Sequence, residues 1–457
     1  MNKNLRRSTE LVELITRGSI PRAILKISVP LIIANTFVVI LELVDAFFVG
    51  RLGSDMFAAV TMGSIVMFFL ATFGMGLGIG TIAMVSRSSG EKDFENVSRI
   101  TLQALYAGFL ISVILTVVGI IFTRPLLILL GAESSILEAA ASYLRILFIG
   151  SFTMFFMFLG NAVFQGAGDT VTPMKISALA TLLNIALDPV MIFGLLGFPA
   201  MGVSGAALAT VISRTAGGIV ILYILFFREH TVRIDRSSLG IDFPLIRRIV
   251  TIGLPGSIQM LMRSFSMVVL IRIVSGFGNT MVAVYGLGGR LFHFFLFPGF
   301  GLGGAASTMV GQNLGAGNPE RAVKSTVIAF YCYLVFLAVT ASLLFAFPGK
   351  VASLFNPETA FVEISEVFFR YVSAGVIFLS ASIIFSRALQ GAGDTMSPMI
   401  ATGISLYIIQ IPLAYYLSNR TVLAETGIWL SLVAGGMINA VLVVLIFFRG
   451  RWKNREL

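Results

Sequence analysis

Long apolar runs separated by short polar segments extend along the whole chain. A membrane-spanning helix needs about 20 mostly apolar residues, whereas a barrel strand would alternate with period two. These runs are continuous and do not alternate. The pattern therefore predicts an all-α integral membrane protein with helical spans at residues 26–49, 57–83, 101–122, 141–163, 175–196, 204–227, 250–273, 281–309, 325–346, 366–388, 398–418 and 427–448.

The amino-acid composition also indicates a membrane protein. Hydrophobic residues make up 57% of the chain and charged residues only 12%, whereas a soluble domain has roughly a quarter charged residues. The net charge of +10 comes from Lys and Arg between the apolar runs, which favours membrane orientation over nucleic-acid binding. Lone Cys332 has no intrachain disulfide partner, and the sequence contains no HExxH, CxxC or Ser–His–Asp pattern, so neither an enzyme nor a cofactor is expected.

The basic residues predict the orientation. Alternate connections are rich in Lys and Arg, and the connections between them contain little beyond Arg51, Arg124, Lys350 and Arg420. The positive-inside rule then places both termini in the cytoplasm of a multi-pass cell-membrane protein, which requires an even number of spans. The cytoplasmic set is Lys3, Arg6, Arg7, Arg17, Arg22, Arg87, Lys92, Arg99, Arg228, Arg233, Arg236, Arg247, Arg248, Arg321, Lys324, Arg449, Arg451, Lys453 and Arg455.

The chain contains an internal repeat. The segment FQGAGDT at 164–170 returns as LQGAGDT at 389–395, an offset of 225 residues, and the same offset maps Pro30 onto Pro255 and Gly53 onto Gly278. No GKS or GKT follows either block, so we interpret both as polar turns. The repeat predicts an N-lobe at 1–227, a cytoplasmic linker at 228–249 and a C-lobe at 250–457. With six spans each, the lobes form parallel repeats around a central cavity, as in transporters.

Polar residues inside two spans of the first half are the main candidates for chemistry. Asn35, Glu42 and Asp45 form a stripe on the first span, and Asn184 and Asp188 lie one turn apart on the fifth. Two carboxylates that face each other in a bundle cannot both stay charged at low cost. One of them is expected to hold a proton, or both share a sodium ion with Asn184.

Pro189 follows Asp188 directly and cannot donate a hydrogen bond to the carbonyl of Ile185. We therefore predict a hinge there. The second half contains Arg263 and Arg290 within its spans. These could pair with the acids, line the cavity or bind lipid head groups, and the sequence leaves the three roles open. His293, among phenylalanines, is interpreted as a packing residue.

With these residues the chain resembles the multidrug and toxic compound extrusion (MATE) family over nearly its whole length. The most specific segments are LVD at 43–45 before FVGRLG at 48–53, and LNIALDP at 183–189. They are similar to the DinF-like branch. The resemblance implies ion-binding roles for Asp45, Asn184, Asp188 and Thr210, and pocket roles for Tyr143 and Asn161. The NorM-like branch has acids on helices seven and ten, where this chain has Arg263, Ser380 and Ser382.

The resemblance implies a monomeric antiporter that exports amphipathic, often cationic drugs or toxins from a lipid membrane in exchange for H⁺ or Na⁺ by alternating access. The pocket residues would then be Asn35, Glu42, Tyr143, Asn161, Arg263 and Arg290. A lipid-linked oligosaccharide flippase of the same superfamily is the alternative, in which the arginines bind an anionic substrate. A receptor or scaffold is disfavoured because no large domain outside the membrane is present in the sequence.

Overall fold

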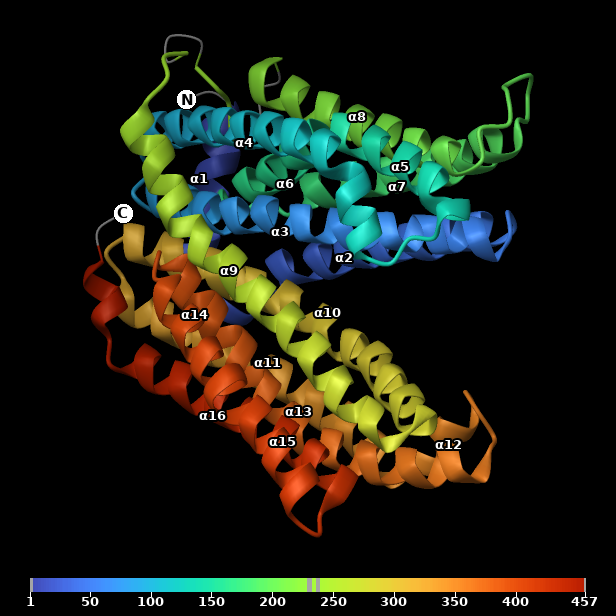
Figure 1. The fold of residues 1–457 in the computed structure, drawn as a ribbon. Helices are drawn as coiled ribbons and strands as arrows, with labels where there is room; N and C mark the ends of the chain where they lie inside the picture. The colour runs from blue at the N-terminus through green and yellow to red at the C-terminus, as the bar shows by residue number, and fades with distance from the viewer. Residues whose placement is uncertain (1–2, 228–231, 236–238, 456–457) are drawn as a thin grey trace. The chain divides into compact units, whose positions relative to one another are not determined.

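The computed structural model describes residues 3–227, 232–235 and 239–455, and these are almost entirely helical (Figure 1). The helices are α1 Lys3–Thr16, α2 Ile20–Gly50, α3 Ser54–Gly90, α4 Phe94–Leu129, α5 Ser134–Ile149, α6 Ser151–Gly166, α7 Val171–Phe193, α8 Val203–Phe227, α9 Phe243–Val274, α10 Asn279–Gly315, α11 Pro319–Ala346, α12 Pro348–Ser353, α13 Thr359–Gly391, α14 Met396–Gly403, α15 Ile411–Arg420 and α16 Ala424–Phe448. Short turns add Ser275–Phe277, Ile404–Gln410 and Arg451–Asn454.

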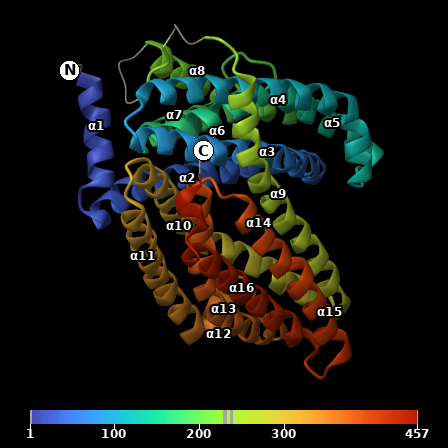
Figure 2. The ribbon, with the colours of Figure 1, turned by 90° about the vertical axis from the view of Figure 1, so that its left-hand side faces the viewer.

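The chain forms two compact units, each an α-helical bundle. One contains residues 1–14 and 29–257, and the other contains residues 15–28 and 258–457. Within the first unit α3 to α8 lie side by side, and within the second α10, α11, α13 and α16 do so (Figures 1 and 2). The opening part of α9 thus belongs to the first unit. The lobe boundaries predicted from the sequence differ at this segment and stay a prediction.

The predicted spans are confirmed as apolar helices. Among the described residues, 11 helices are long and apolar enough to cross a membrane, and a bent pair, α5 and α6, makes up to 12. The predicted single span at 141–163 is therefore broken, with an angle of 47° between its halves. The break falls at Gly150 and Ser151, a pair typical of helix kinks. A Cβ on Gly150 would lie 2.3 Å from Val211 Cγ2, so glycine permits the close approach of α8.

The internal repeat is visible in the helix boundaries. Helix α3 begins at Ser54 and α10 at Asn279, which is 225 residues later. The glycines just before them share the same rare backbone, with φ of 105° at Gly53 and 97° at Gly278. The offset falls to 221 between the starts of α8 and α16, at Val203 and Ala424. Two similar bundles therefore follow from one repeated sequence pattern, as predicted.

The two GAGDT segments are helix-to-helix joints. Gly168 and Gly393 end their helices with φ of 87° and 82°, a conformation that favours glycine. Asp169 then caps α7, because Thr172 donates its backbone N–H to Oδ1 at 3.1 Å and its hydroxyl to Oδ2 at 2.8 Å. Asp394 receives the equivalent bonds from Ser397 at 3.3 and 2.7 Å. The interpretation of both segments as polar turns is confirmed.

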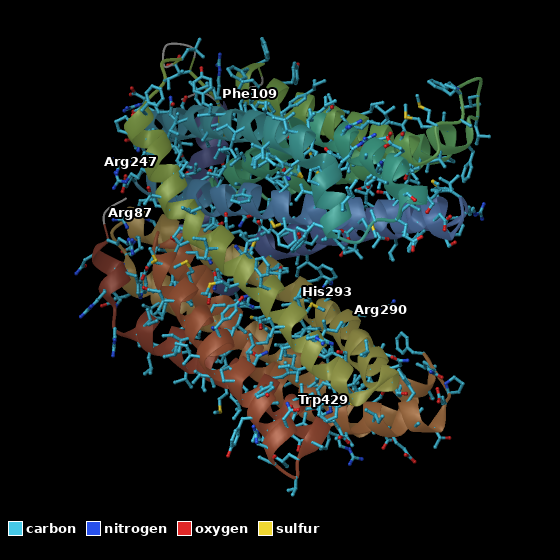
Figure 3. All side chains as sticks on the ribbon, viewed as in Figure 1. Arg87, Phe109, Arg247, Arg290, His293 and Trp429 are labelled. Atoms are coloured by element: carbon cyan, nitrogen blue, oxygen red, sulfur yellow. The ribbon has the colours of Figure 1, made fainter. Side chains whose placement is uncertain are left out.

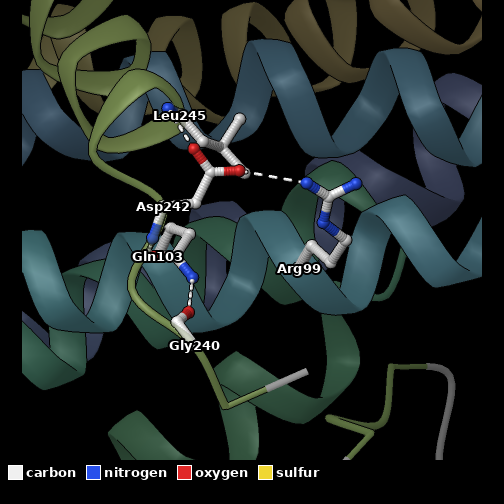
Figure 4. A network of polar contacts seen from close by, with 5 residues as sticks. All are labelled: Arg99, Gln103, Gly240, Asp242 and Leu245. Atoms are coloured by element: carbon white, nitrogen blue, oxygen red, sulfur yellow. Dashed lines mark hydrogen bonds and ion pairs between the residues drawn. The ribbon is translucent and has the colours of Figure 1, made fainter. Parts of the chain in front are cut away.

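The described part of the interhelical linker is fastened to α4 (Figure 4). The guanidinium of Arg99 lies 3.0 Å from Asp242 Oδ2. Gln103 donates to the carbonyl of Gly240 at 2.7 Å and accepts from the backbone N–H of Asp242 at 3.0 Å. Asp242 also caps α9 by accepting from Leu245 N–H at 3.0 Å. The start of α9 is therefore positioned by the first unit, whereas the predicted linker residues 228–231 and 236–238 lie outside the described residues.

Candidate functional site

Three helices of the first unit bring the predicted ion-binding residues together. Helix α2 supplies Asp45, α7 supplies Asn184 and Asp188, and α8 supplies Thr210. Asn184 and Asp188 are 0% exposed. They lie four residues apart and therefore on one face of α7, which packs along α8. A polar cluster is thus buried where the apolar sequence would otherwise place core residues.

The amide of Asn184 connects the cluster. With its nitrogen turned toward the carboxylates, it donates to Asp45 Oδ1 at 3.2 Å and to Asp188 Oδ2 at 3.1 Å. Its oxygen then accepts from the backbone N–H of Thr210 at 3.2 Å. The opposite orientation leaves a 3.5 Å contact from the amide nitrogen to Thr210 Oγ1. The bonding partners select the first orientation, because a buried amide is assigned by the network it satisfies.

The side chains of Asp45 and Asp188 also interact with each other, and both accept from the Asn184 amide nitrogen. An ionised carboxylate only accepts, so a hydrogen bond between two carboxyl groups requires one proton. Close carboxyl pairs can hold one such proton between them, and their titration then belongs to the pair and not to either residue. The geometry is thus suited to holding and releasing a proton.

Arg214 is a member of this site that the sequence reasoning missed. It lies on α8 one turn after Thr210 and is half-buried. Its guanidinium interacts electrostatically with Asp45, Glu42 and Tyr143. The signal was present in the sequence, because Arg214 falls near the middle of the span at 204–227 and an arginine there is costly. The expectation that acids gather in the first half and arginines in the second was therefore incomplete.

Tyr143 and Glu42 lie at the edge of the cluster. Tyr143 on α5 is 6% exposed and interacts with Ser64 and with both aspartates. A Cβ on Gly63 would lie 2.6 Å from the Tyr143 ring, so that glycine makes room for the ring. Glu42 is exposed and interacts with Arg214. Both predicted pocket residues are therefore near the carboxyl pair.

The remaining predicted residues of the first unit are Asn35, Asn161 and Pro189. Asn35 is half-buried on α2, and Asn161 on α6 has a buried side-chain oxygen with no hydrogen-bond partner among the described residues. Pro189 lies inside α7, and the helix continues past it to Phe193 without a break. The pocket roles of Asn35 and Asn161 and the hinge role of Pro189 stay predictions.

Arg263 and Arg290 belong to the second unit. Arg263 on α9 is exposed and interacts electrostatically with Arg387, whose guanidinium lies 5.7 Å from the Phe300 ring centroid. Arg290 on α10 is also exposed, near His293 (Figure 3). Trp429 in the same view packs against Phe368 in the unit's core, with ring centroids 4.4 Å apart. The three alternative roles of the two arginines remain open.

Two groups of the cluster bear on the binding of a sodium ion. Hard cations are bound by oxygen ligands. In the orientation described, the Asn184 amide presents its nitrogen to the carboxylates, and its oxygen accepts from the Thr210 N–H. Arg214 adds a resident cation that interacts with Asp45. The shared sodium site at Asp45, Asn184 and Asp188 stays a prediction.

Comparison with known proteins gives one family. The MatE family model matches residues 30–190 and 255–416, once in each half. The probable multidrug resistance protein YoeA of Bacillus subtilis (strain 168) is 29% identical over 97% of this chain and 96% of its own. An FAD transporter of Shewanella oneidensis is 27% identical over 86% and 87%.

Solved structures agree with this result. A crystal structure of MATE in the bent conformation matches with a TM-score of 0.90 and 27% identity, over 97% of both chains. The family match covers most of the chain, the fold matches throughout, and the named relatives include multidrug resistance proteins. The chain belongs to the MatE family and is a multi-pass membrane protein with the fold of MATE transporters.

Proposed function

We propose that the chain is a proton-coupled antiporter that exports amphipathic, often cationic organic compounds by alternating access. The observation that carries this proposal is the pair of carboxyl groups of Asp45 and Asp188, which lie on different helices inside the membrane-spanning part and are joined by the Asn184 amide. Ionisable groups at such positions mark proton relays and ion pathways in membrane proteins.

Coupling follows from what the proton does to the cluster. While it is held, the pair carries one negative charge, and the proton between the two carboxyl groups joins Asp45 on α2 to Asp188 on α7. When it leaves, two carboxylates face each other and repel, with only Asn184 donating to both. A proton that favours one arrangement of these helices and a drug that favours the other would exchange across the membrane.

The choice of the proton over sodium rests on Asn184 and Arg214. The amide donates to both carboxylates, and the guanidinium already neutralises part of their charge. A sodium ion would have to replace an N–H donor with an oxygen and to approach a fixed positive charge. Both cost free energy in a site of low dielectric constant.

Other features of the chain support a location, an oligomeric state and a second candidate substrate. The basic connections support a cell-membrane location with both termini cytoplasmic. The site works within one unit, so we propose that a monomer suffices. A relative named as an FAD transporter supports a second candidate, export of a phosphate-bearing anion. Arg263 and Arg290 favour it because guanidiniums bind phosphate.

The proposal is tested with purified protein in lipid vesicles. A pH gradient alone is expected to drive the movement of a cationic dye such as ethidium, whereas a sodium gradient at equal pH on both sides does not. Movement driven by sodium alone would contradict the proton assignment. Movement of FAD but not of any cationic dye under a pH gradient would favour the second candidate.

Replacing Arg214 should change the ion preference. In the Arg214→Met variant the resident cation is lost while a chain of similar length still fills the space, so sodium can approach the carboxyl pair. We expect added sodium to lower proton-driven dye efflux roughly 5-fold or more in the variant, and to leave the wild type unchanged.

Arg214→Lys is the matched control, since it keeps the charge and should stay insensitive to sodium. The measurement is dye efflux from vesicles at fixed pH with rising NaCl, with KCl as the ionic-strength reference. Equal sodium sensitivity in the wild type and in both variants would rule out a role for the guanidinium in ion choice.

A further inference from the structure

The second unit contains a basic pocket beyond the last membrane-spanning helix. Its volume is about 380 Å³. It lies between the end of α16, the turn Arg451–Asn454 and the start of α14. The lining residues are Asp394, Ser397, Ile446, Arg449, Arg451, Trp452 and Arg455. Three guanidiniums and one carboxylate thus surround a space far from the proton site in sequence and in a different unit.

The charges of this pocket are only partly used by the protein. Arg455 pairs with Asp394, with 2.8 Å between Nη1 and Oδ1. Asp394 is further occupied by Ser397, whose hydroxyl donates to Oδ2 at 2.7 Å. Arg449 and Arg451 are exposed and make no side-chain hydrogen bond or ion pair within the described residues. Two guanidiniums with free donors therefore face a cavity whose single acid is already satisfied.

The turn that carries these arginines is held in place. Gly450 takes a left-handed backbone with φ of 75° and lets the chain reverse after α16. Trp452 is 2% exposed, stacks on Phe447 with centroids 4.8 Å apart, and donates its indole N–H to the Phe447 carbonyl at 2.7 Å. The positions of Arg449 and Arg451 are thus fixed by a buried anchor, which lowers the entropy cost of binding a ligand.

The pocket also has an apolar approach on the lipid side. Helix α16 is a membrane span, so its end lies at the depth where the hydrocarbon core meets the head groups. Leu445 and Phe448, which adjoin the lining residues Ile446 and Arg449 along α16, are 54% and 60% exposed. A molecule with a phosphate group and an acyl chain could contact both parts of this region. Its phosphate would bind the arginines, and its acyl chain would lie along Leu445 and Phe448. Guanidiniums recognise phosphate by paired hydrogen bonds, which free lysines cannot make.

We propose that this pocket, with Arg449 and Arg451 as its ligands, is a binding site for the phosphate head group of an anionic phospholipid. The free anion, inorganic phosphate, offers the same charge without the acyl chain. Leu445 and Phe448 therefore favour the lipid over phosphate from solution. The site shares no residue with the proton pair and belongs to the other compact unit, so its failure would leave the proposed transport mechanism intact.

The test compares lipid retention in detergent-solubilised full-length protein by native mass spectrometry, with added phosphatidylglycerol or phosphatidylcholine. The Arg449→Gln/Arg451→Gln variant is expected to bind phosphatidylglycerol at least about tenfold more weakly than the wild type. Each basic residue near the membrane surface raises the affinity for anionic lipid several-fold. Phosphatidylcholine binding should not change. Arg449→Lys/Arg451→Lys keeps the charge but loses paired donors, and should fall between the two.

Arg247→Gln/Arg248→Gln is the matched control. Both residues are exposed near the start of α9, where Figure 3 labels Arg247, and the net charge changes by the same amount. An equal loss of phosphatidylglycerol in this control would overturn the proposal, because binding would then follow overall charge. Unchanged binding in the Arg449 and Arg451 variant would also overturn it. Displacement of the lipid by millimolar inorganic phosphate would assign the pocket to the free anion instead.

Discussion

Asp45→Asn and Asp188→Asn should each abolish most of the proton-driven efflux of the transporter. An amide cannot take up and release the shared proton, although it fills the same volume and can keep one hydrogen bond to its neighbour. Coupling free energies between two sites typically correspond to 5- to 150-fold changes, and we expect a loss of roughly that size in dye efflux under an imposed pH gradient. Drug binding measured without a gradient should persist.

Asp55→Asn is the control for this pair. It makes the same chemical change at an exposed residue in the first turn of α3, and efflux should remain at the wild-type rate. Thermal unfolding in detergent separates a transport defect from a folding defect, since the Asn variants are expected to unfold near the wild-type temperature. If both Asp45→Asn and Asp188→Asn transport normally, the proposed mechanism is wrong.

Gly391→Ala should strongly destabilise the second unit. Gly391 is the last residue of α13, where a Cβ would lie 2.2 Å from the carbonyl oxygen of Ser307 and 2.7 Å from its Cα on α10. Both are backbone atoms of a packed helix and cannot rotate away. Overpacking of this kind costs about 1–3 kcal/mol or more, so the unfolding temperature and the yield of monodisperse protein should fall.

Gly286→Ala gives the opposite expectation on the neighbouring helix. Gly286 lies within α10, and a Cβ there would meet nothing within 4 Å. Alanine favours helix over glycine by roughly 0.5–1 kcal/mol, so this variant should be as stable as the wild type or slightly more stable. Both variants are compared by fluorescence-detected thermal unfolding. A Gly391→Ala protein as stable as Gly286→Ala would contradict the close packing described.

Most of the fold could be predicted from the sequence because one physical signal dominates it. Apolar runs of membrane length gave the spans, and the offset of 225 residues gave the two repeats. The break at Gly150 was not predicted, since a kink leaves the hydropathy of the run unchanged. Helix α1 was missed for a related reason: it lies before the apolar runs and is too polar to register as a span.

The candidate site was predictable in its acids but not in its balance of charge. Asp45, Asn184 and Asp188 stood out as polar residues in apolar surroundings, and the structure brings them together. Arg214 carries the same signal, yet its partners lie on α2 and α5, and no spacing along the chain connects it to them. The orientation of the Asn184 amide depends on the backbone N–H of Thr210, a donor that every residue but proline has and that no sequence pattern reveals.

The division of α9 between the two compact units has a consequence for the order of events during synthesis. The first unit extends to Ser257, well into a helix whose remaining residues belong to the second unit. Asp242, which Arg99 and Gln103 of α4 bind, lies just before that helix and is therefore made late as well. The growing chain must therefore release the start of its second repeat from the ribosome before the first bundle can close. We expect a chain stopped at residue 227 to reach the membrane as an unfinished unit, with α4 lacking the segment that covers it.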